Sequence, residues 1–206
     1  AAYGNFVHRI LTLGSRLTSG TNGPFESLES SDVTSKHKEK LESMYLEIST
    51  SLNKHRFKEA LRTAMKAAQY GNQIIQAATP WKYLSEDEQS SAGAKESLAT
   101  LAFGWRICRF LSIVMQPFMP FSSQKLWHSL GQPGDVSQVN WSEAINWNSQ
   151  MTWNNDKPEP LFKRLDLEEI LEHEQSLASG SESDDKEATH AVKGGKKGGK
   201  NMSKEV

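Results

Sequence analysis

The stretch that decides the fold is residues 94–131, which read AKESLATLAFGWRICRFLSIVMQPFMPFSSQKLWHSLG. Up to Met115, apolar residues occupy most sides of a helix, which is typical of a central helix enclosed by others. Pro117 ends that helix because proline cannot continue the hydrogen-bond ladder, and Pro120 starts the next one. The second helix closes at Gly131, a residue typical of helix C-termini. This stretch therefore predicts two consecutive helices, the first of them in the middle of a core.

Three further helices are predicted before this stretch. Apolar residues recur at alternating steps of three and four from Tyr3 to Leu17, from Leu41 to Leu52 and from Phe57 to Ile75, the spacing of one helical face. The segment from Thr18 to Lys36 is rich in Ser, Thr, Gly and Pro without a period, which indicates a long loop. No strand-like alternation competes in this part of the chain. We therefore predict an all-α fold, an antiparallel helical bundle of about five helices over residues 1–131.

After the bundle the sequence turns to Trp, Asn, Asp and Pro with little regular period. Residues 132–177 are expected to form an irregular wrap packed on the bundle, ending in a short acidic amphipathic helix at Leu165 to Leu177. Three tryptophans are expected to anchor this wrap: Trp141, Trp147 and Trp153. Trp105 and Trp127, which stand among apolar residues, are expected in the core. Residues 178–206, first Ser, Asp and Glu and then Gly and Lys, have nothing apolar to bury and predict a disordered linker.

Charge divides unevenly along the chain. The 206 residues hold 24 Lys and Arg against 25 Asp and Glu, a net charge of −1, which taken alone argues against a nucleic-acid binder. Up to Lys125, however, the chain carries 15 basic and 11 acidic residues, and the remainder carries 9 and 14. The predicted bundle is therefore mildly basic, and the acidic excess belongs to the C-terminal part.

Several classes of protein are excluded or disfavoured by composition. One cysteine, Cys108, cannot form an internal disulfide, and no Cys/His spacing suits a metal, so a reducing, cytoplasmic setting without a metal site is expected. The longest apolar stretch, from Ile107 to Phe121, is interrupted and falls short of the ~20 residues of a membrane span. No nucleophile elbow, phosphate-binding loop or paired carboxylates are visible, and the histidines are scattered. We predict no catalytic residue and no cofactor. Because the chain starts at Ala1 rather than Met, we interpret it as a piece of a longer protein.

Two groups of polar residues are candidates for binding. Asn5, Arg9 and Arg16 lie at i, i+4 and i+11, so they share one face of the first helix. Amides and guanidiniums suit base edges and phosphates, although a solvated helix face has the same pattern. In Pro80-Trp81-Lys82, with Thr79 expected as an N-cap, a tryptophan beside a proline and a lysine could stack on an unpaired base. Core packing of this tryptophan is the alternative.

Several motifs resemble those of a known family. The segment Leu111-Ser-Ile-Val-Met-Gln-Pro-Phe-Met-Pro-Phe-Ser-Ser-Gln-Lys-Leu-Trp127 resembles the helix–proline–helix junction in anticodon-binding domains of class I aminoacyl-tRNA synthetases for Val, Ile, Leu and Met. Asn5-Phe-Val-His-Arg9 resembles the Asn-x-x-x-Arg of methionyl-tRNA synthetases, and the segment from Asn72 to Trp81 resembles their Asn followed by Pro-Trp. Lys157-Pro-Glu-Pro-Leu-Phe-Lys163 is similar to the exit from the bundle in archaeal and eukaryotic-type members. The resemblance covers about residues 1–175.

This resemblance implies a set of contacts with the anticodon CAU of methionine tRNA. Asn5 and Arg9 would read and clamp anticodon bases, Trp81 would stack on one of them, and Pro80 would fix the orientation of that tryptophan. Three residues are weaker candidates for contacts with tRNA: Arg16, Asn72 and Lys82. The family often has an aromatic residue where this chain has Ile74, so the packing around this position is expected to differ from that of the family.

The same resemblance implies a division of labour in a longer cytoplasmic enzyme. ATP and methionine would bind to a catalytic domain absent from this chain, on which the bundle would pack, and neither DNA nor a membrane is an expected partner. The lysines of residues 193–204 would attract tRNA non-specifically. In other members such a linker leads to an OB-fold domain, whose first strand could begin at Met202 to Val206, and any dimerisation would be through that region.

Three other interpretations remain open from the sequence. The chain could be the anticodon-binding domain of a valine or isoleucine enzyme, because the helix–proline–helix junction is common to the class. It could also be a helical protein-interaction module without RNA binding. An independent enzyme is the least supported, because no constellation of catalytic residues is visible.

Overall fold

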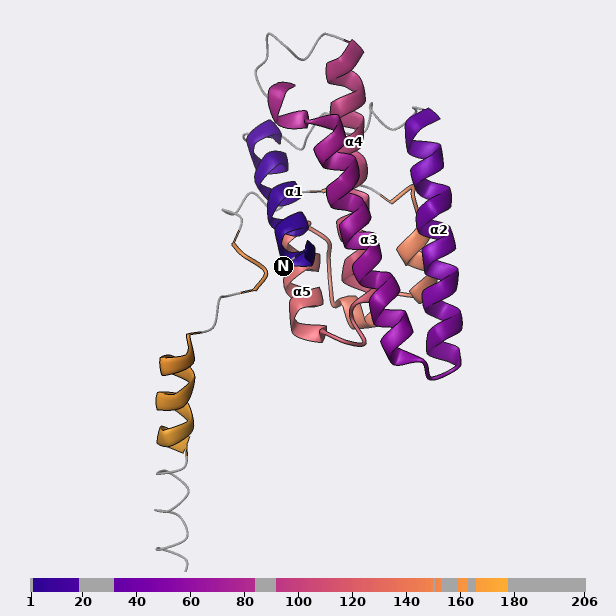
Figure 1. The fold of residues 1–206 in the computed structure, drawn as a ribbon. Helices are drawn as coiled ribbons and strands as arrows, with labels where there is room; N and C mark the ends of the chain where they lie inside the picture. The colour runs from indigo at the N-terminus through magenta and orange to yellow at the C-terminus, as the bar shows by residue number, and fades with distance from the viewer. Residues whose placement is uncertain are drawn as a thin grey trace, which may run out of the picture. The chain divides into compact units, whose positions relative to one another are not determined.

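The computed structural model describes residues 2–18, 32–83, 92–149, 151–152, 159–162 and 166–177 (Figure 1). The α-helices are α1 (Ala2–Thr18), α2 (Asp32–Asn53), α3 (Phe57–Ala78), α4 (Ala92–Val114) and α5 (Pro120–Ser129). Short 3-10 helices follow α3 and α5: η2 (Pro80–Tyr83), η4 (Val136–Gln138) and η5 (Trp141–Ile145). No described residue is in a strand. The predicted all-α bundle of about five helices is confirmed.

The chain divides into two compact units, Ala1–Phe162 and Lys163–Val206. The first holds the five helices of the bundle together with η2, η4 and η5. The second contains one described helix, at residues 167–177, which lies within the amphipathic helix predicted there. The predicted linker, residues 178–206, lies outside the described residues, as do Trp153 and part of the motif from Lys157 to Lys163.

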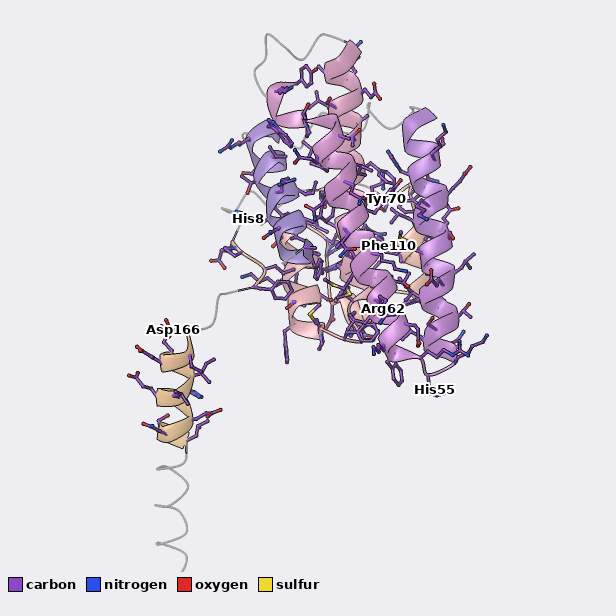
Figure 2. All side chains as sticks on the ribbon, in the orientation of Figure 1. His8, His55, Arg62, Tyr70, Phe110 and Asp166 are labelled. Carbon is purple, nitrogen blue, oxygen red and sulfur yellow. The ribbon has the colours of Figure 1, made fainter. Side chains whose placement is uncertain are left out.

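Helix α4 is the centre of the bundle. It contacts α1, α2, α3 and α5, and residues 101–115 are buried without exception, with Phe110 in the interior (Figure 2). The segment Gly93–Val114 has the length and the apolar composition of a membrane-spanning helix, but its most apolar part is entirely buried within the protein. Such burial is expected of a central core helix. Trp105 and Trp127 are 0% and 3% exposed, which confirms that both belong to the core.

Helix α3 lies between α1 and α2 (Figure 1). A turn of three residues joins it to α2, and Ser97 of α4 donates a hydrogen bond to the carbonyl of Ala78 at its C-terminal end (2.7 Å). On its α1 side, Gly71 lets the helices approach closely, because a Cβ there would lie 2.5 Å from Cζ of Phe6. This close approach sets which residues of α1 and α3 face each other.

Residues after α5 fold back onto the bundle. The indole N–H of Trp141 donates to Oγ of Ser49 (2.8 Å), and that of Trp147 donates to Oε1 of Glu42 (2.7 Å). Both partners lie on α2, so these two tryptophans anchor the segment as predicted. On the α4 side, the guanidinium of Arg109 pairs with the carboxylate of Glu143 at 3.1 Å.

Three local expectations differ from the structure. Helix α2 begins at Asp32, inside the predicted loop. Ser35 and Lys36 near its start are exposed, so no apolar period marks this part of the helix. Phe57 starts α3 but is 56% exposed, with its ring edge-on to His55. Thr79 is the C-cap of α3 and not an N-cap, and the short helix that follows starts at Pro80. The hydrogen bond from the backbone N–H of Thr79 back to Ile75 completes α3.

Candidate nucleic-acid interface

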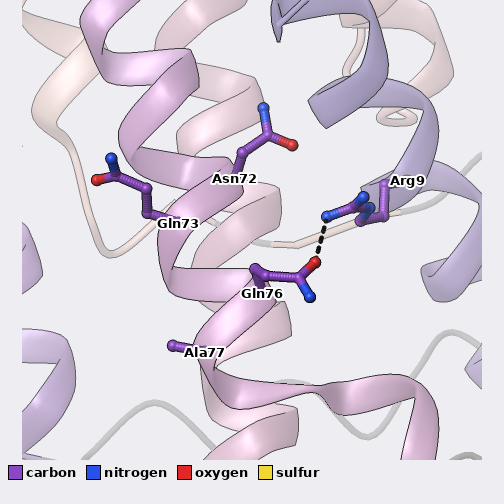
Figure 3. A pocket seen from close by; sticks show the side chains of 5 residues that line it. All are labelled: Arg9, Asn72, Gln73, Gln76 and Ala77. Atoms are coloured by element: carbon purple, nitrogen blue, oxygen red, sulfur yellow. Dashed lines mark hydrogen bonds between the residues drawn. The ribbon is translucent and has the colours of Figure 1, made fainter.

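Helices α1 and α3 and the short helix η2 meet around Arg9. Its Nη1 donates a hydrogen bond to Oε1 of Gln76 on α3 at 3.3 Å (Figure 3). Its guanidinium carbon lies 5.9 Å from the centroid of the Trp81 ring in η2, within the range of a cation–π contact. One side chain of α1 thus contacts both elements.

The turn between α3 and η2 brings Trp81 back towards α1. Thr79 adopts a left-handed conformation with φ of 47°, which is a rare conformation for a β-branched residue. Its N–H bonds the carbonyl of Ile75, and its own carbonyl accepts from the N–H of Lys82, both at 3.1 Å. Pro80 is buried, whereas Trp81 keeps 36% of its surface exposed. The turn therefore fixes the indole and leaves part of it accessible.

Two hollows adjoin Arg9. The first, of about 540 Å³, is lined by five residues of α1 and α3: Arg9, Asn72, Gln73, Gln76 and Ala77 (Figure 3). The second, of about 360 Å³, runs along the outer side of α1 and is lined by Asn5, His8, Arg9, Thr12, Leu13 and Arg16. Arg9 is common to both, so the two hollows connect the predicted polar face of α1 with the C-terminal half of α3.

The structure brings some of the predicted site residues together and places the others around them. Arg9 and Trp81 are in contact, and Asn72 lines the first hollow. The amide of Asn72 donates to the carbonyls of Ala2 (3.0 Å) and Ala68 (3.2 Å), so it also ties the start of α1 to α3. The remaining candidates lie around this centre: Asn5 and Arg16 are exposed along the second hollow, Lys82 is exposed on η2, and Pro80 is buried beneath Trp81's turn.

Sequence reasoning missed Gln73 and Gln76. Both are exposed, both line the first hollow, and Gln76 is the hydrogen-bond partner of Arg9. The sequence held only a weak signal, because Gln76 lies one helical turn after Asn72 and the two therefore share a side of α3. Side-chain amides that both donate and accept can read base edges.

The chemistry of this surface is that of binding. Helix α1 carries Arg9 and Arg16 and contains no Asp or Glu, so the local charge is positive. Strong perturbations of pKa occur elsewhere: burial raises the pKa of the Tyr3 phenol and of the Cys108 thiol, both in the core. Within the described residues, no group of His, Cys, Asp or Glu is placed to hold a metal ion.

Comparison of the sequence with known proteins identifies a family that binds RNA through such a domain. Residues 38–177 match the family described as the anticodon-binding domain of tRNA ligase. The chain is 33% identical to a methionine–tRNA ligase of Methanopyrus kandleri over 86% of its own length and 24% of the relative, and 30% identical to that of Pyrococcus abyssi over 82% and 21%. A methionine–tRNA ligase of Methanosarcina mazei is 25% identical over 96% and 26%. The chain therefore spans about a quarter of the length of these relatives.

Proposed function

The chain belongs to the family of anticodon-binding domains of tRNA ligases, and from that premise we propose that it recognises the CAU anticodon of methionine tRNA. The observation that carries the proposal is the placement of Arg9 over Trp81, beside a hollow that three side-chain amides line on a helical surface. An aromatic plane next to a guanidinium is suited to an unstacked base of a single-stranded loop.

Each side chain of the interface has a role in this proposal. Trp81 stacks on one anticodon base, and Pro80 and the left-handed Thr79 hold its ring in place. Arg9 stacks on or clamps a neighbouring base, and the amides of Gln73 and Gln76 bind base edges in the first hollow. Asn5 and Arg16 extend the contact along α1, with Asn72 and Lys82 at its margins.

The chain would act as the recognition part of a methionine–tRNA ligase in the cytoplasm. The relatives are about four times longer, and ATP and methionine would bind in a part of the enzyme outside this chain. Binding energy spent on the anticodon would hold the acceptor end in place for the distant reaction. In this scheme residues 1–131 recognise the loop, the segment that follows α5 braces the bundle through Trp141 and Trp147, and the lysines of residues 193–204 attract tRNA non-specifically.

The alternatives are less well supported. The relatives named above are methionine–tRNA ligases rather than enzymes for valine or isoleucine. A protein-interaction module without RNA binding is less well supported, because the family that matches residues 38–177 is that of anticodon-binding domains.

The proposal is tested with a panel of fluorescently labelled RNA stem-loops that share one stem and differ only in the anticodon: CAU, CAC and GAU. Anisotropy titrations of the chain should give the highest affinity for CAU. Each changed base is expected to reduce the free energy of binding by roughly 1–3 kcal/mol, because the stacking or hydrogen bonds of the original base are lost. Equal affinity for the three RNAs would overturn the proposal, and preference for CAC or GAU would favour a valine or isoleucine enzyme.

A further inference from the structure

The outward face of α3 carries a continuous row of polar side chains. Residues at steps of three and four along one helix fall on the same face. We name this row the α3 stripe; its members, all exposed, are Lys58, Arg62, Lys66, Gln69, Gln73 and Gln76. Figure 2 labels Arg62 on this helix. The stripe is cationic in its first half and uncharged in its second.

The uncharged end of the stripe coincides with the proposed anticodon site. Gln73 and Gln76 line the first hollow, and Gln76 is bonded to Arg9. The cationic end points away from it: Lys58 precedes Gln76 by 18 residues, which corresponds to about 27 Å along a helix. The stripe is therefore a path that leads from the hollow to the opposite end of the bundle.

The cations of the stripe are available for an external partner. Within the described residues, the ion pairs are those of Arg109 and Lys125, and neither involves the stripe. The acidic residue of α3, Glu59, lies one turn before Thr63, whose hydroxyl donates to Glu47 of α2 at 2.8 Å. Glu59 is thus at the α2-facing edge of the helix and not in the stripe.

We propose that Lys58, Arg62 and Lys66 bind phosphates of the base-paired stem that continues from the anticodon loop. This inference rests on the proposed function, because it needs the loop to occupy the hollow beside Arg9. The order of side chains fits that placement: amides and an indole suit unpaired bases, whereas lysine and arginine suit the phosphates of a duplex, which is recognised by its backbone rather than its bases. The stripe would set the direction in which the tRNA leaves the bundle.

The test compares two RNAs with one variant. The RNAs are a CAU stem-loop and an unpaired oligonucleotide that carries the same loop sequence, and the variant is Lys58→Ala/Arg62→Ala/Lys66→Ala. Alanine keeps the helix propensity of α3. We expect the variant to bind the stem-loop about tenfold or more weakly, with the slope of log K against log salt reduced by roughly 2 to 3. Its affinity for the unpaired oligonucleotide should change little.

A charge-matched control separates a specific contact from loss of net charge. Lys36→Ala/Lys38→Ala/Lys40→Ala removes three cations from α2, away from the first hollow, and should weaken stem-loop binding much less. The inference is overturned if both triple variants lose the same affinity, or if the stripe variant binds the stem-loop as wild type does. Trp81→Ala distinguishes the two proposals: it should weaken both RNAs, and if it weakens neither, the proposed function fails. A stripe variant without effect beside a defective Trp81→Ala rejects only the stem contact.

Discussion

The guanidinium of Arg9 lies over the ring of Trp81, with 5.9 Å between its central carbon and the ring centroid. The two residues are far apart in the chain and come together because α1 packs against α3 and the turn at Thr79 redirects the chain after α3. Each holds the other: the cation orients the indole, and the indole and Gln76 hold the guanidinium. This pair is the centre of the proposed anticodon site.

Replacing Arg9 by Lys should weaken RNA binding even though the charge is kept. Lysine lacks the planar guanidinium that contacts the Trp81 ring and Gln76 together, and the loss is expected to be roughly 1 kcal/mol. Anisotropy titration with the CAU stem-loop measures it. Arg16→Lys is the matched control, because Arg16 is exposed along the second hollow only, and it should cost less. Equal losses for the two variants would contradict the role given to the ring contact.

Gly71→Ala should destabilise the bundle. The added Cβ would lie 2.5 Å from Cζ and 2.6 Å from Cε2 of the fully buried Phe6, so α1 or the ring must move, at a cost of about 1–3 kcal/mol. Urea unfolding measures the change. Gly93→Ala is the control, because its Cβ would meet the hydroxyl of Tyr83 at 3.3 Å and Cζ of the same ring at 3.8 Å, the end of a half-exposed side chain that can shift, and it should stay within about 0.5 kcal/mol of wild type. Comparable stability of the two variants would contradict the close packing of α1 on α3.

Trp147→Ala should reduce stability and leave RNA affinity unchanged. The Trp147 ring packs 5.8 Å from that of Phe103, and its N–H bonds Glu42 on α2, so truncation should cost roughly 1–3 kcal/mol. Trp147→Phe keeps most of the packing and should lose only about 1 kcal/mol, the worth of the hydrogen bond. Thermal or urea unfolding gives these values. A fully folded Trp147→Ala with weakened RNA binding would show that this tryptophan belongs to the interface instead.

The Arg109–Glu143 pair should make stability fall at acid pH. The amide of Asn146 and then the guanidinium of Arg109 lower the pKa of the Glu143 carboxyl below its ordinary value of 4.5. A lowered carboxyl pKa stabilises the folded state above the unfolded pKa, and this contribution is lost as pH falls through the folded pKa. The stability difference between wild type and Glu143→Gln should therefore be largest near neutral pH and shrink below about pH 4.5. Urea unfolding from pH 7 down to pH 3 checks this, and a difference that stays constant would contradict the stabilising role of the ionised carboxylate.

Much of the fold could be predicted because its signals are local. The apolar spacing of the first three helices and the apolar character of α4 follow directly from which faces are buried, and Pro117 and Pro120 mark the boundary between α4 and α5. The start of α2 could not be found in this way, since Ser35 and Lys36 near it are exposed and polar and show no apolar period. The left-handed Thr79 was also missed, because a threonine before a proline more often caps the helix that follows.

The candidate site was predictable only where a residue type is distinctive. Arg9 and Trp81 stand out for their chemistry, but Gln73 and Gln76 do not, because amides on a helix surface are ordinary. Their role depends on the packing of α1 against α3, which brings Gln76 within hydrogen-bond distance of Arg9. The tryptophans after α5 were identified as anchors, whereas their partners on α2, Glu42 and Ser49, could not be, since nothing periodic relates the two segments.

The most direct test of the central claim is the affinity of a Trp81→Ala variant for the CAU stem-loop, measured by anisotropy beside wild type and Trp147→Ala at one salt concentration. If Trp81 stacks on an anticodon base, Trp81→Ala should bind more weakly by roughly 1–3 kcal/mol, while folded Trp147→Ala binds as wild type does. Equal affinity of wild type and Trp81→Ala for this RNA would contradict the account.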